Sequence, residues 1–266
     1  MMIDGHTHLE YGPLDKEYVR QFVEKAAERG ITTLHILDHT HRFSDFRPIY
    51  EPLMAIEEQD KWLHGPLKFQ NNLDDYVKLI NECRQEEWPI EVKFGLEICH
   101  TPEGKEHIKK VLDEYGHNFD FLVGAIHSID TRLYDMGFSD KILWNVFDYD
   151  AIYTRYYELV EDLICSDLYT QLAHPDTIKM FNHYPSYDLT PTYHRIAQLL
   201  KQHNMKAENN TGCHYRYNHK DIGLSDELLQ IFKEHGVTMI TASDAHHPED
   251  VGTDIKDVWD VTMKER

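Results

Sequence analysis

A carboxylate and an imidazole follow a short apolar run near the C-terminal end of the sequence. Residues 237–241 are mostly apolar and come directly after Gly236, which predicts a short buried strand. Asp244 and His246 lie just beyond this run, two residues apart, so both side chains point the same way if the segment is extended. Carboxylate oxygens and imidazole nitrogens are ligands for divalent ions such as zinc and manganese. The pair therefore predicts a metal site at the end of this strand.

The same pattern recurs at the ends of six earlier predicted strands, each of which ends in or precedes a histidine or a carboxylate. These residues are His6 and His8, Asp38 and His39, Glu97, His127, His174, and Glu208. One polar residue at a strand end is ordinary because loops are polar, but solvation does not readily explain such residues at all seven ends. The pattern therefore favours a polynuclear centre of divalent ions, for which zinc, manganese and iron are all suitable.

Strands that alternate with helices must position these residues. The predicted strands lie near Ile3 and at 33–37, 90–97, 119–126, 169–173, 205–208 and 237–241. The predicted helices lie at about 15–30, 74–87, 101–116, 148–167, 190–204 and 227–235. This alternation implies parallel strands in βαβ units, and seven units indicate a closed α/β barrel of the TIM type with one strand fewer. A doubly wound open sheet is the alternative. In a barrel, all the strand ends in question share one face.

No linker or composition shift divides the chain, so we expect a single domain over residues 1–266. The stretch from residue 41 to residue 70 is longer than an ordinary loop between a strand and a helix. It is rich in large side chains such as Phe43, Tyr50 and Trp62, which favours a lid over a substrate. A packed insertion with its own short helix is the alternative.

The overall charge limits the classes of partner. Lys and Arg number 27 against 47 Asp and Glu, and this net charge of −20 argues against a broad nucleic-acid or membrane surface but not against a small anionic substrate. The four cysteines form no CxxC pair, which is typical of reduced thiols. The N-terminus shows no signal-peptide pattern and no apolar run has membrane-spanning length, so we expect a cytoplasmic location. The sequence does not indicate an oligomeric state.

Taken together, the strand-end motifs resemble those of the polymerase and histidinol phosphatase (PHP) superfamily. The matching motifs are Asp4-Gly-His-Thr-His, the Asp38-His39 pair, Gly95-Leu-Glu97, His127, His174-Pro-Asp, and Ser243-Asp-Ala-His246. They occur in the family's order over nearly the whole chain. The resemblance implies a distorted (β/α)7 TIM-like barrel with its metal site at the C-terminal face of the strands, two or three divalent ions, and phosphoester hydrolysis.

The resemblance also assigns ligands to each ion. It gives His6, His8, Glu97 and Asp244 to a first ion, a bridging Glu97 with His127 and His174 to a second, and His39 and His246 to a third. The position that normally completes the third site is Leu14 here, so the sequence departs from the family pattern. Glu10 and Asp15 are the nearby carboxylates. Asp15 is better explained as a helix cap, so we expect Glu10 to substitute.

The implied activity is that of a phosphomonoesterase of the histidinol phosphatase branch, converting L-histidinol phosphate to L-histidinol and phosphate. Hydrolysis of another small or nucleotide phosphoester is an alternative, and so is a non-catalytic metal-binding module. The candidates for protonating the leaving group are Asp244, His246 and His41. The candidates for binding phosphate are Arg42, which follows the second predicted strand, and Arg155 and Arg195, which lie early in helices.

Overall fold

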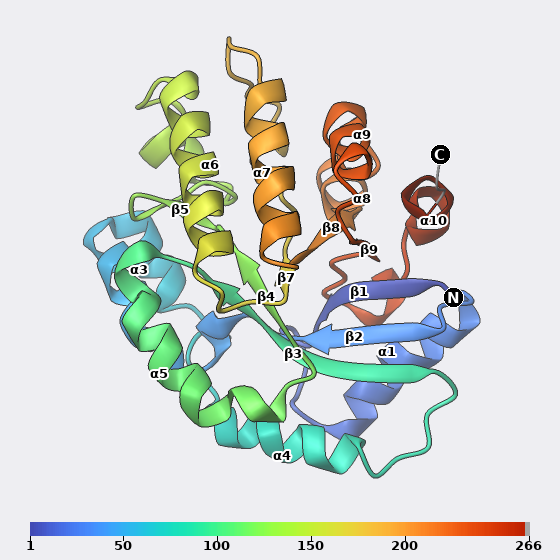
Figure 1. Ribbon diagram of the computed structural model, residues 1–266. Helices are drawn as coiled ribbons and strands as arrows, with labels where there is room; N and C mark the ends of the chain where they lie inside the picture. The colour runs from blue at the N-terminus through green and yellow to red at the C-terminus, as the bar shows by residue number, and fades with distance from the viewer. Residues whose placement is uncertain (264–266) are drawn as a thin grey trace.

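The computed structural model describes residues 1–263 and contains a sheet of seven parallel strands (Figure 1). In sheet order the strands are β1 (Ile3–His8), β2 (Thr33–Leu37), β3 (Glu91–Cys99), β4 (Phe121–Ala125), β7 (Gln171–Leu172), β8 (Lys206–Asn210) and β9 (Met239–Ala242). Every neighbouring pair is parallel. The strand order follows the chain order, as repeated βαβ units require.

Contacts between the first and last strands nearly close this sheet into a barrel. Thr7 pairs with Ala245 in a parallel bridge, and the backbone N–H of His8 donates to the carbonyl of Ala245 over 2.7 Å. Beside this bridge, the buried Asp4 carboxylate accepts hydrogen bonds from the backbone N–H and the hydroxyl of Ser243. The structure therefore confirms the predicted seven-stranded TIM-like barrel over the open sheet.

Helices on the outside of the barrel connect successive strands (Figure 1). The longer ones are α1 (Lys16–Glu28), α4 (Leu73–Cys83), α5 (Lys105–Tyr115), α6 (Tyr149–Cys165), α7 (Thr190–Gln202), α9 (Asp226–Glu234) and α10 (Ile255–Met263). None of the helices in residues 1–263 combines the length and apolar character needed to cross a membrane.

Helix α1 shows how the local sequence determines such an element. Asp15 caps its N-terminus by accepting a 2.8 Å hydrogen bond from the backbone N–H of Tyr18, as expected from the sequence. Phe22, Val23 and Ala26 recur at helical spacing and are fully buried. This apolar face holds the helix against the barrel.

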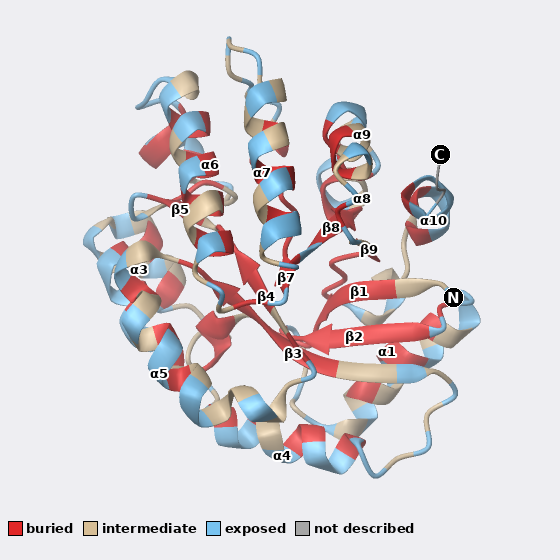
Figure 2. Cartoon of the chain, viewed as in Figure 1, coloured by how far each residue is buried: buried red, intermediate tan, exposed pale blue. Residues whose placement is uncertain are grey.

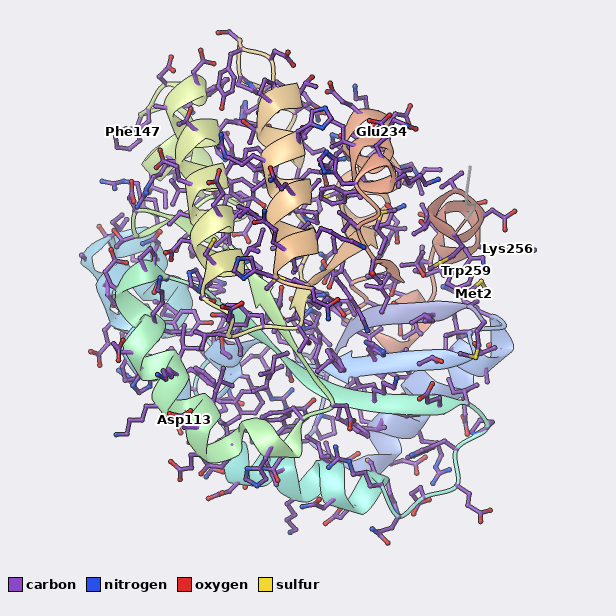
Figure 3. The ribbon with its side chains drawn as sticks, viewed as in Figure 1. Met2, Asp113, Phe147, Glu234, Lys256 and Trp259 are labelled. Atoms are coloured by element: carbon purple, nitrogen blue, oxygen red, sulfur yellow. The ribbon has the colours of Figure 1, made fainter. Side chains whose placement is uncertain are left out.

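Burial follows the layered architecture. The strands are mostly buried, whereas the helices alternate between buried inner faces and exposed outer faces (Figure 2). Side chains fill the space between these layers, and Asp113, Phe147 and Glu234 lie at the outer surface (Figure 3). The packing of the helices against the strands thus fixes the positions of the strand ends.

The stretch from residue 41 to residue 70 packs against the rest of the fold. It consists of short helical turns, η1 (Thr40–Arg42), η2 (Ser44–Phe46), α2 (Arg47–Tyr50), η3 (Glu51–Ala55) and α3 (Glu57–Leu63). Phe43 and Phe46 are fully buried, and Tyr50 is nearly so. The core therefore accounts for Phe43, whereas Tyr50 and Trp62 also line the pocket described below, so a lid over a substrate stays a prediction.

Several short elements were not predicted from the sequence. They are the hairpin β5 (Ser128–Ile129) and β6 (Arg132–Leu133), the π-helical turn η6 (Asp140–Trp144), the 3-10 turns η4 (Pro102–Gly104), η5 (Gly116–Asn118), η7 (Thr177–Lys179) and η8 (Pro248–Asp250), and helix α8 (Gly212–Tyr217). Elements of two to six residues are too short for hydrophobic periodicity to reveal them. One of them, α8, directly follows β8 and contributes to the site described next.

Candidate metal centre

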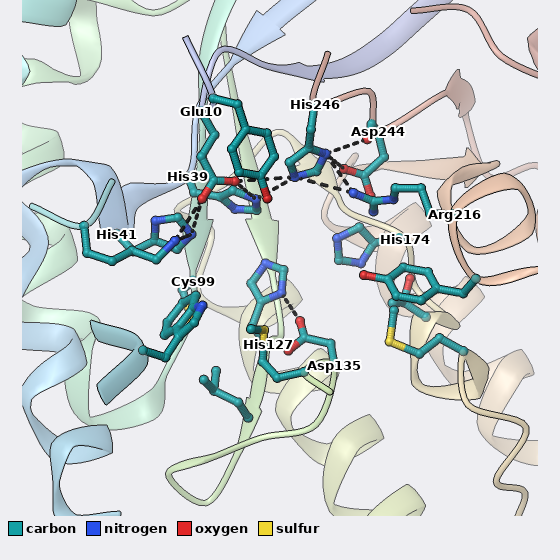
Figure 4. A pocket seen from close by; sticks show the side chains of 18 of the residues that line it. Glu10, His39, His41, Cys99, His127, Asp135, His174, Arg216, Asp244 and His246 are labelled. Atoms are coloured by element: carbon teal, nitrogen blue, oxygen red, sulfur yellow. Dashed lines mark hydrogen bonds and ion pairs between the residues drawn. The ribbon is translucent and has the colours of Figure 1, made fainter. Parts of the chain in front are cut away.

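Histidine and carboxylate side chains from the strand ends converge on one pocket at the carboxyl face of the barrel. His39, His127, His174 and His246 point toward one another from the ends of β2, β4, β7 and β9 (Figure 4). Because all seven strands are parallel, residues far apart in the sequence meet here.

The carboxylate of Glu97 lies at the centre of this cluster. Its Oε1 atom is 3.1 Å from Nε2 of both His127 and His174. Its Oε2 atom is 2.5 Å from Nδ1 of His39, 3.6 Å from Nε2 of His8 and 3.7 Å from Nε2 of His6. Five imidazole nitrogens therefore surround one carboxylate that is 1% exposed.

Asp244 completes the inner side of the cluster. Its Oδ1 atom is 3.2 Å from Nε2 of His8 and 3.8 Å from Nε2 of His6, and these two nitrogens face each other at 2.8 Å. Asp244 has a φ of 58°, an uncommon left-handed conformation for a residue other than glycine. The backbone at the end of β9 thus turns sharply where the carboxylate enters the site.

The outer nitrogens of two histidines are held by carboxylates. Nδ1 of His6 lies 2.8 Å from Oε1 of Glu208, and Nδ1 of His127 lies 2.7 Å from Oδ2 of Asp135. A hydrogen bond at Nδ1 fixes the ring and leaves Nε2 to act as a ligand. In both cases Nε2 faces Glu97. Asp135 was not predicted as a site residue, because it becomes a neighbour of His127 only through the short β5–β6 hairpin.

A second group of donors lies on the outer side of the cluster. Nε2 of His39 is 3.3 Å from Nε2 of His246, and Oε2 of Glu10 is 3.8 Å and 3.7 Å from these two nitrogens. The structure thus brings Glu10 to the position for which the sequence indicated a substitute carboxylate. Asp15 instead caps α1, as expected.

Protonation states across the cluster suit metal binding. Burial alone would raise the pKa of Glu97, but the charges of His39 and His127 outweigh it and hold the pKa well below its usual range. The pKa of His8 falls to about 3, because of burial first and the charge of His39 second. Burial also lowers the pKa of His6, yet Glu208 and Glu97 raise it well above the ordinary value. An ion bound to His6 would therefore displace a proton.

The donor set fits divalent ions. Among the described residues, none donates a hydrogen bond to Oε2 of Glu97, although three imidazole nitrogens surround this buried atom. Three of the triads whose donor atoms lie close enough to share an ion are His6–His8–Glu97, His39–Glu97–His127 and His8–His39–His246. Mixed nitrogen and oxygen donors of this kind suit zinc, manganese or iron.

Two cations that were not predicted from the sequence also line the pocket. Arg216, from α8, lies 2.8 Å from Oδ2 of Asp244 and 2.7 Å from Nδ1 of His246. Lys68 lies on the opposite side, 2.8 Å from Oε1 of Glu10. Arg216 follows the end of β8 by six residues, so extending the search for arginines beyond each strand end would have found it.

The three predicted phosphate-binding arginines do not line this pocket, and the structure corrects their assignment. Arg42 is 6% exposed and points into the fold, where it donates to Asp38 and to the carbonyls of Leu9 and Gly12. Arg155 pairs with Asp130 and Glu158 on the outer surface of α6, and Arg195 pairs with Glu161 on the outer surface of α7. Nearness to a strand end along the chain did not place these side chains in the site.

His41 does line the pocket. Its Nε2 atom lies 3.3 Å from Nζ of Lys68 and 3.6 Å from Oε1 of Glu10. Burial, followed by the charge of Lys68, lowers the pKa of His41 well below its ordinary value. The ring is therefore neutral at physiological pH, and its Nε2 accepts a hydrogen bond from Lys68.

Comparison with known proteins agrees with this geometry. The family model described as "PHP domain" matches residues 4–212, and the chain belongs to the PHP family. The chain is 22% identical over 268 residues to a protein named histidinol-phosphatase from Bacillus subtilis, covering 94% of this chain and 95% of that protein.

Two solved structures share the fold over most of the chain. HisK from Listeria monocytogenes has a TM-score of 0.78 and 19% identity, with 96% of this chain and 99% of that chain covered. Histidinol phosphate phosphatase from Lactococcus lactis, solved with zinc, L-histidinol and phosphate, has a TM-score of 0.71 and 19% identity, with 98% and 92% covered. At this level of identity the likeness establishes the barrel alone.

Proposed function

We propose that this protein is a metal-dependent phosphomonoesterase that hydrolyses L-histidinol phosphate to L-histidinol and phosphate. The observation that carries the proposal is the set of five imidazole nitrogens within 3.7 Å of the Glu97 carboxylate, at the carboxyl face of a PHP barrel. The substrate is supported by the name of the Bacillus relative and by the L-histidinol and phosphate in the Lactococcus structure. The proposal assigns this activity to a single barrel domain over residues 1–266.

In the proposed reaction, water attacks phosphorus, the bond between phosphorus and the ester oxygen breaks, and the histidinol alkoxide takes up a proton. Zinc, manganese or iron ions held by Glu97 and its histidines would acidify water and offset charge on the phosphoryl oxygens. Three residues that line the pocket, Asp244, His246 and His41, are the candidates for taking up the proton that the attacking water loses and passing it to the alkoxide.

The remaining lining residues suit the rest of the substrate. Arg216 and Lys68 offer positive charge on two sides of the cluster to a dianionic phosphate. The rings of Tyr11, Trp62 and Tyr217 also line the pocket and provide flat surfaces on which the imidazole of histidinol could pack. The partner in this proposal is therefore a small phosphorylated molecule.

A comparison of substrates tests the proposal. Phosphate release would be measured with the zinc- and the manganese-loaded protein on L-histidinol phosphate, p-nitrophenyl phosphate and bis(p-nitrophenyl) phosphate. We expect kcat/KM to be at least ~100-fold higher for L-histidinol phosphate, because its imidazole and amino groups add binding energy. A higher kcat/KM for the diester would contradict the proposal and indicate a phosphodiesterase. No release from any of the three would indicate a non-catalytic metal-binding module.

A further inference from the structure

Lys68, in the insertion between β2 and α4, reaches the metal centre. Lys68 lies between Leu67 and Phe69, whose φ angles are 77° and 54°. Left-handed backbone is uncommon at large side chains, and here it occurs on both sides of the lysine. The backbone N–H of Phe69 donates to the carbonyl of His41 over 2.8 Å, which fixes this segment beside the pocket.

The side chain of Lys68 is buried in a site built for a cation. It is 7% exposed, and its Nζ lies 2.8 Å from Oε1 of Glu10 and 3.3 Å from Nε2 of His41. The same ammonium lies 4.4 Å from the centre of the Trp62 ring, at cation–π distance. A buried ammonium requires such partners, because an unpaired charge in the interior is strongly unfavourable.

These partners coincide with a candidate metal triad. The donor atoms of Glu10, His39 and His41 lie close enough together to hold an ion, yet two of these three residues contact Lys68. The two carboxylate oxygens of Glu10 face different neighbours. Oε1 faces Lys68, whereas Oε2 faces His39 and His246. An ion on the Oε2 side would share one carboxylate with an ammonium, so the two positive charges would repel each other.

The resemblance to the PHP family implies a further ligand for a third ion at the position of Leu14, and a leucine offers no donor atom. We propose that the Lys68 ammonium takes the place of the third metal ion. The centre then holds two divalent ions around Glu97, and Lys68 supplies the positive charge on the Glu10 side. The number of bound ions does not depend on the proposed function. Only the role of the Lys68 charge, which is to face the substrate phosphate, rests on it.

Metal stoichiometry tests the inference without any substrate. The wild-type protein, Lys68→Met and Lys68→Arg would be equilibrated with the same free concentration of zinc, separated from unbound ions, and analysed for bound zinc by mass spectrometry. We expect two ions per chain in the wild type and in Lys68→Arg, and three in Lys68→Met. Thermal denaturation would verify that each variant is folded.

Two further variants make the result specific. Lys105→Met removes a partly exposed lysine that pairs with Asp162 outside the pocket, and it should keep two ions. Glu10→Gln combined with Lys68→Met should return the count from three to two, because the added ion depends on Glu10. Three ions in the wild type would overturn the inference, and so would an unchanged count in folded Lys68→Met. Because ions are counted, this outcome is independent of whether L-histidinol phosphate is the substrate.

Discussion

Nδ1 of His6 lies 2.8 Å from Oε1 of Glu208, and both side chains are fully buried. This contact orients the His6 ring so that Nε2 faces Glu97 and Asp244. Glu208 thus acts behind the metal cluster, although it lies at a strand end like the ligands themselves.

The first prediction follows from this contact. Glu208→Gln should weaken zinc binding roughly 10- to 100-fold, because the amide is a poorer partner for the His6 ring than the carboxylate. Competition with a chelator of known affinity would measure the change. Glu91→Gln, at the exposed start of β3, is the matched control and should bind zinc as the wild type does. Equal affinities in the two variants would contradict the proposed role of Glu208.

The second prediction concerns the phosphate. Arg216→Gln should lower kcat/KM for L-histidinol phosphate roughly 100-fold, because it removes a guanidinium that pairs with Asp244 at the pocket wall. Steady-state kinetics and zinc content would be measured together, so that a loss of metal is distinguished from a loss of phosphate binding. Arg155→Gln, on the outer surface of α6, should leave kcat/KM unchanged. A lower kcat/KM in Arg155→Gln together with an unchanged value in Arg216→Gln would instead assign phosphate binding to Arg155.

The third prediction concerns Arg42, whose expected contact with phosphate is replaced by a structural role. Arg42→Gln should reduce the free energy of unfolding by about 3–5 kcal/mol, since it leaves the buried carboxylate of Asp38 without its cation. Chemical denaturation of the zinc-loaded protein would measure this. Arg195→Gln breaks an exposed pair and should change stability by less than about 1 kcal/mol. A stable Arg42→Gln variant with weakened substrate binding would restore the original assignment.

The fourth prediction concerns acid stability. Burial, followed by the charges of Lys93 and Lys206, lowers the pKa of His35 to about 3 from an ordinary value of 6.5. Below pH 6.5 the unfolded chain therefore binds a proton at this residue that the folded chain does not bind, so stability decreases as the pH falls toward 3. This loss amounts to at most about 1.4 kcal/mol per pH unit.

His35→Phe should make that decrease less steep, because phenylalanine does not titrate and can retain the stacking on Phe121. Unfolding free energies at pH 7 and pH 5 would be compared between the variant and the wild type, since the metal ligands contribute equally to both. His64→Gln, an exposed histidine, serves as the control. Parallel pH dependence in all three proteins would contradict the role of His35.

The sequence predicted the barrel and the cluster because both depend on local patterns. The strand Thr33–Leu37 was predicted from a mostly apolar run and has the same bounds in the structure, and the ligands follow closely after the strand ends. Parallel pairing then brings His39 and His246 to within 3.3 Å across 207 residues. No contact across the chain had to be known in advance for this part of the prediction.

The strand-end pattern that predicted the ligands did not predict the cations. The position of Lys68 depends on the left-handed backbone at Leu67 and Phe69, and that of Arg216 depends on a helix of six residues. Arg42 lies near a strand end along the chain, yet its side chain is drawn into the fold by Asp38. The direction of a long side chain is decided by its partners in the folded chain, which the sequence does not list.

The most direct test of the proposed function is phosphate release from L-histidinol phosphate in three steps. The zinc-loaded protein would be assayed as prepared, after removal of zinc by a chelator, and after zinc is restored, with His127→Ala assayed in parallel. We expect rapid release, loss of activity with the chelator, recovery with zinc, and a folded but inactive His127→Ala protein. Release that persists in the chelated protein or in His127→Ala would contradict a reaction that depends on the Glu97 metal centre.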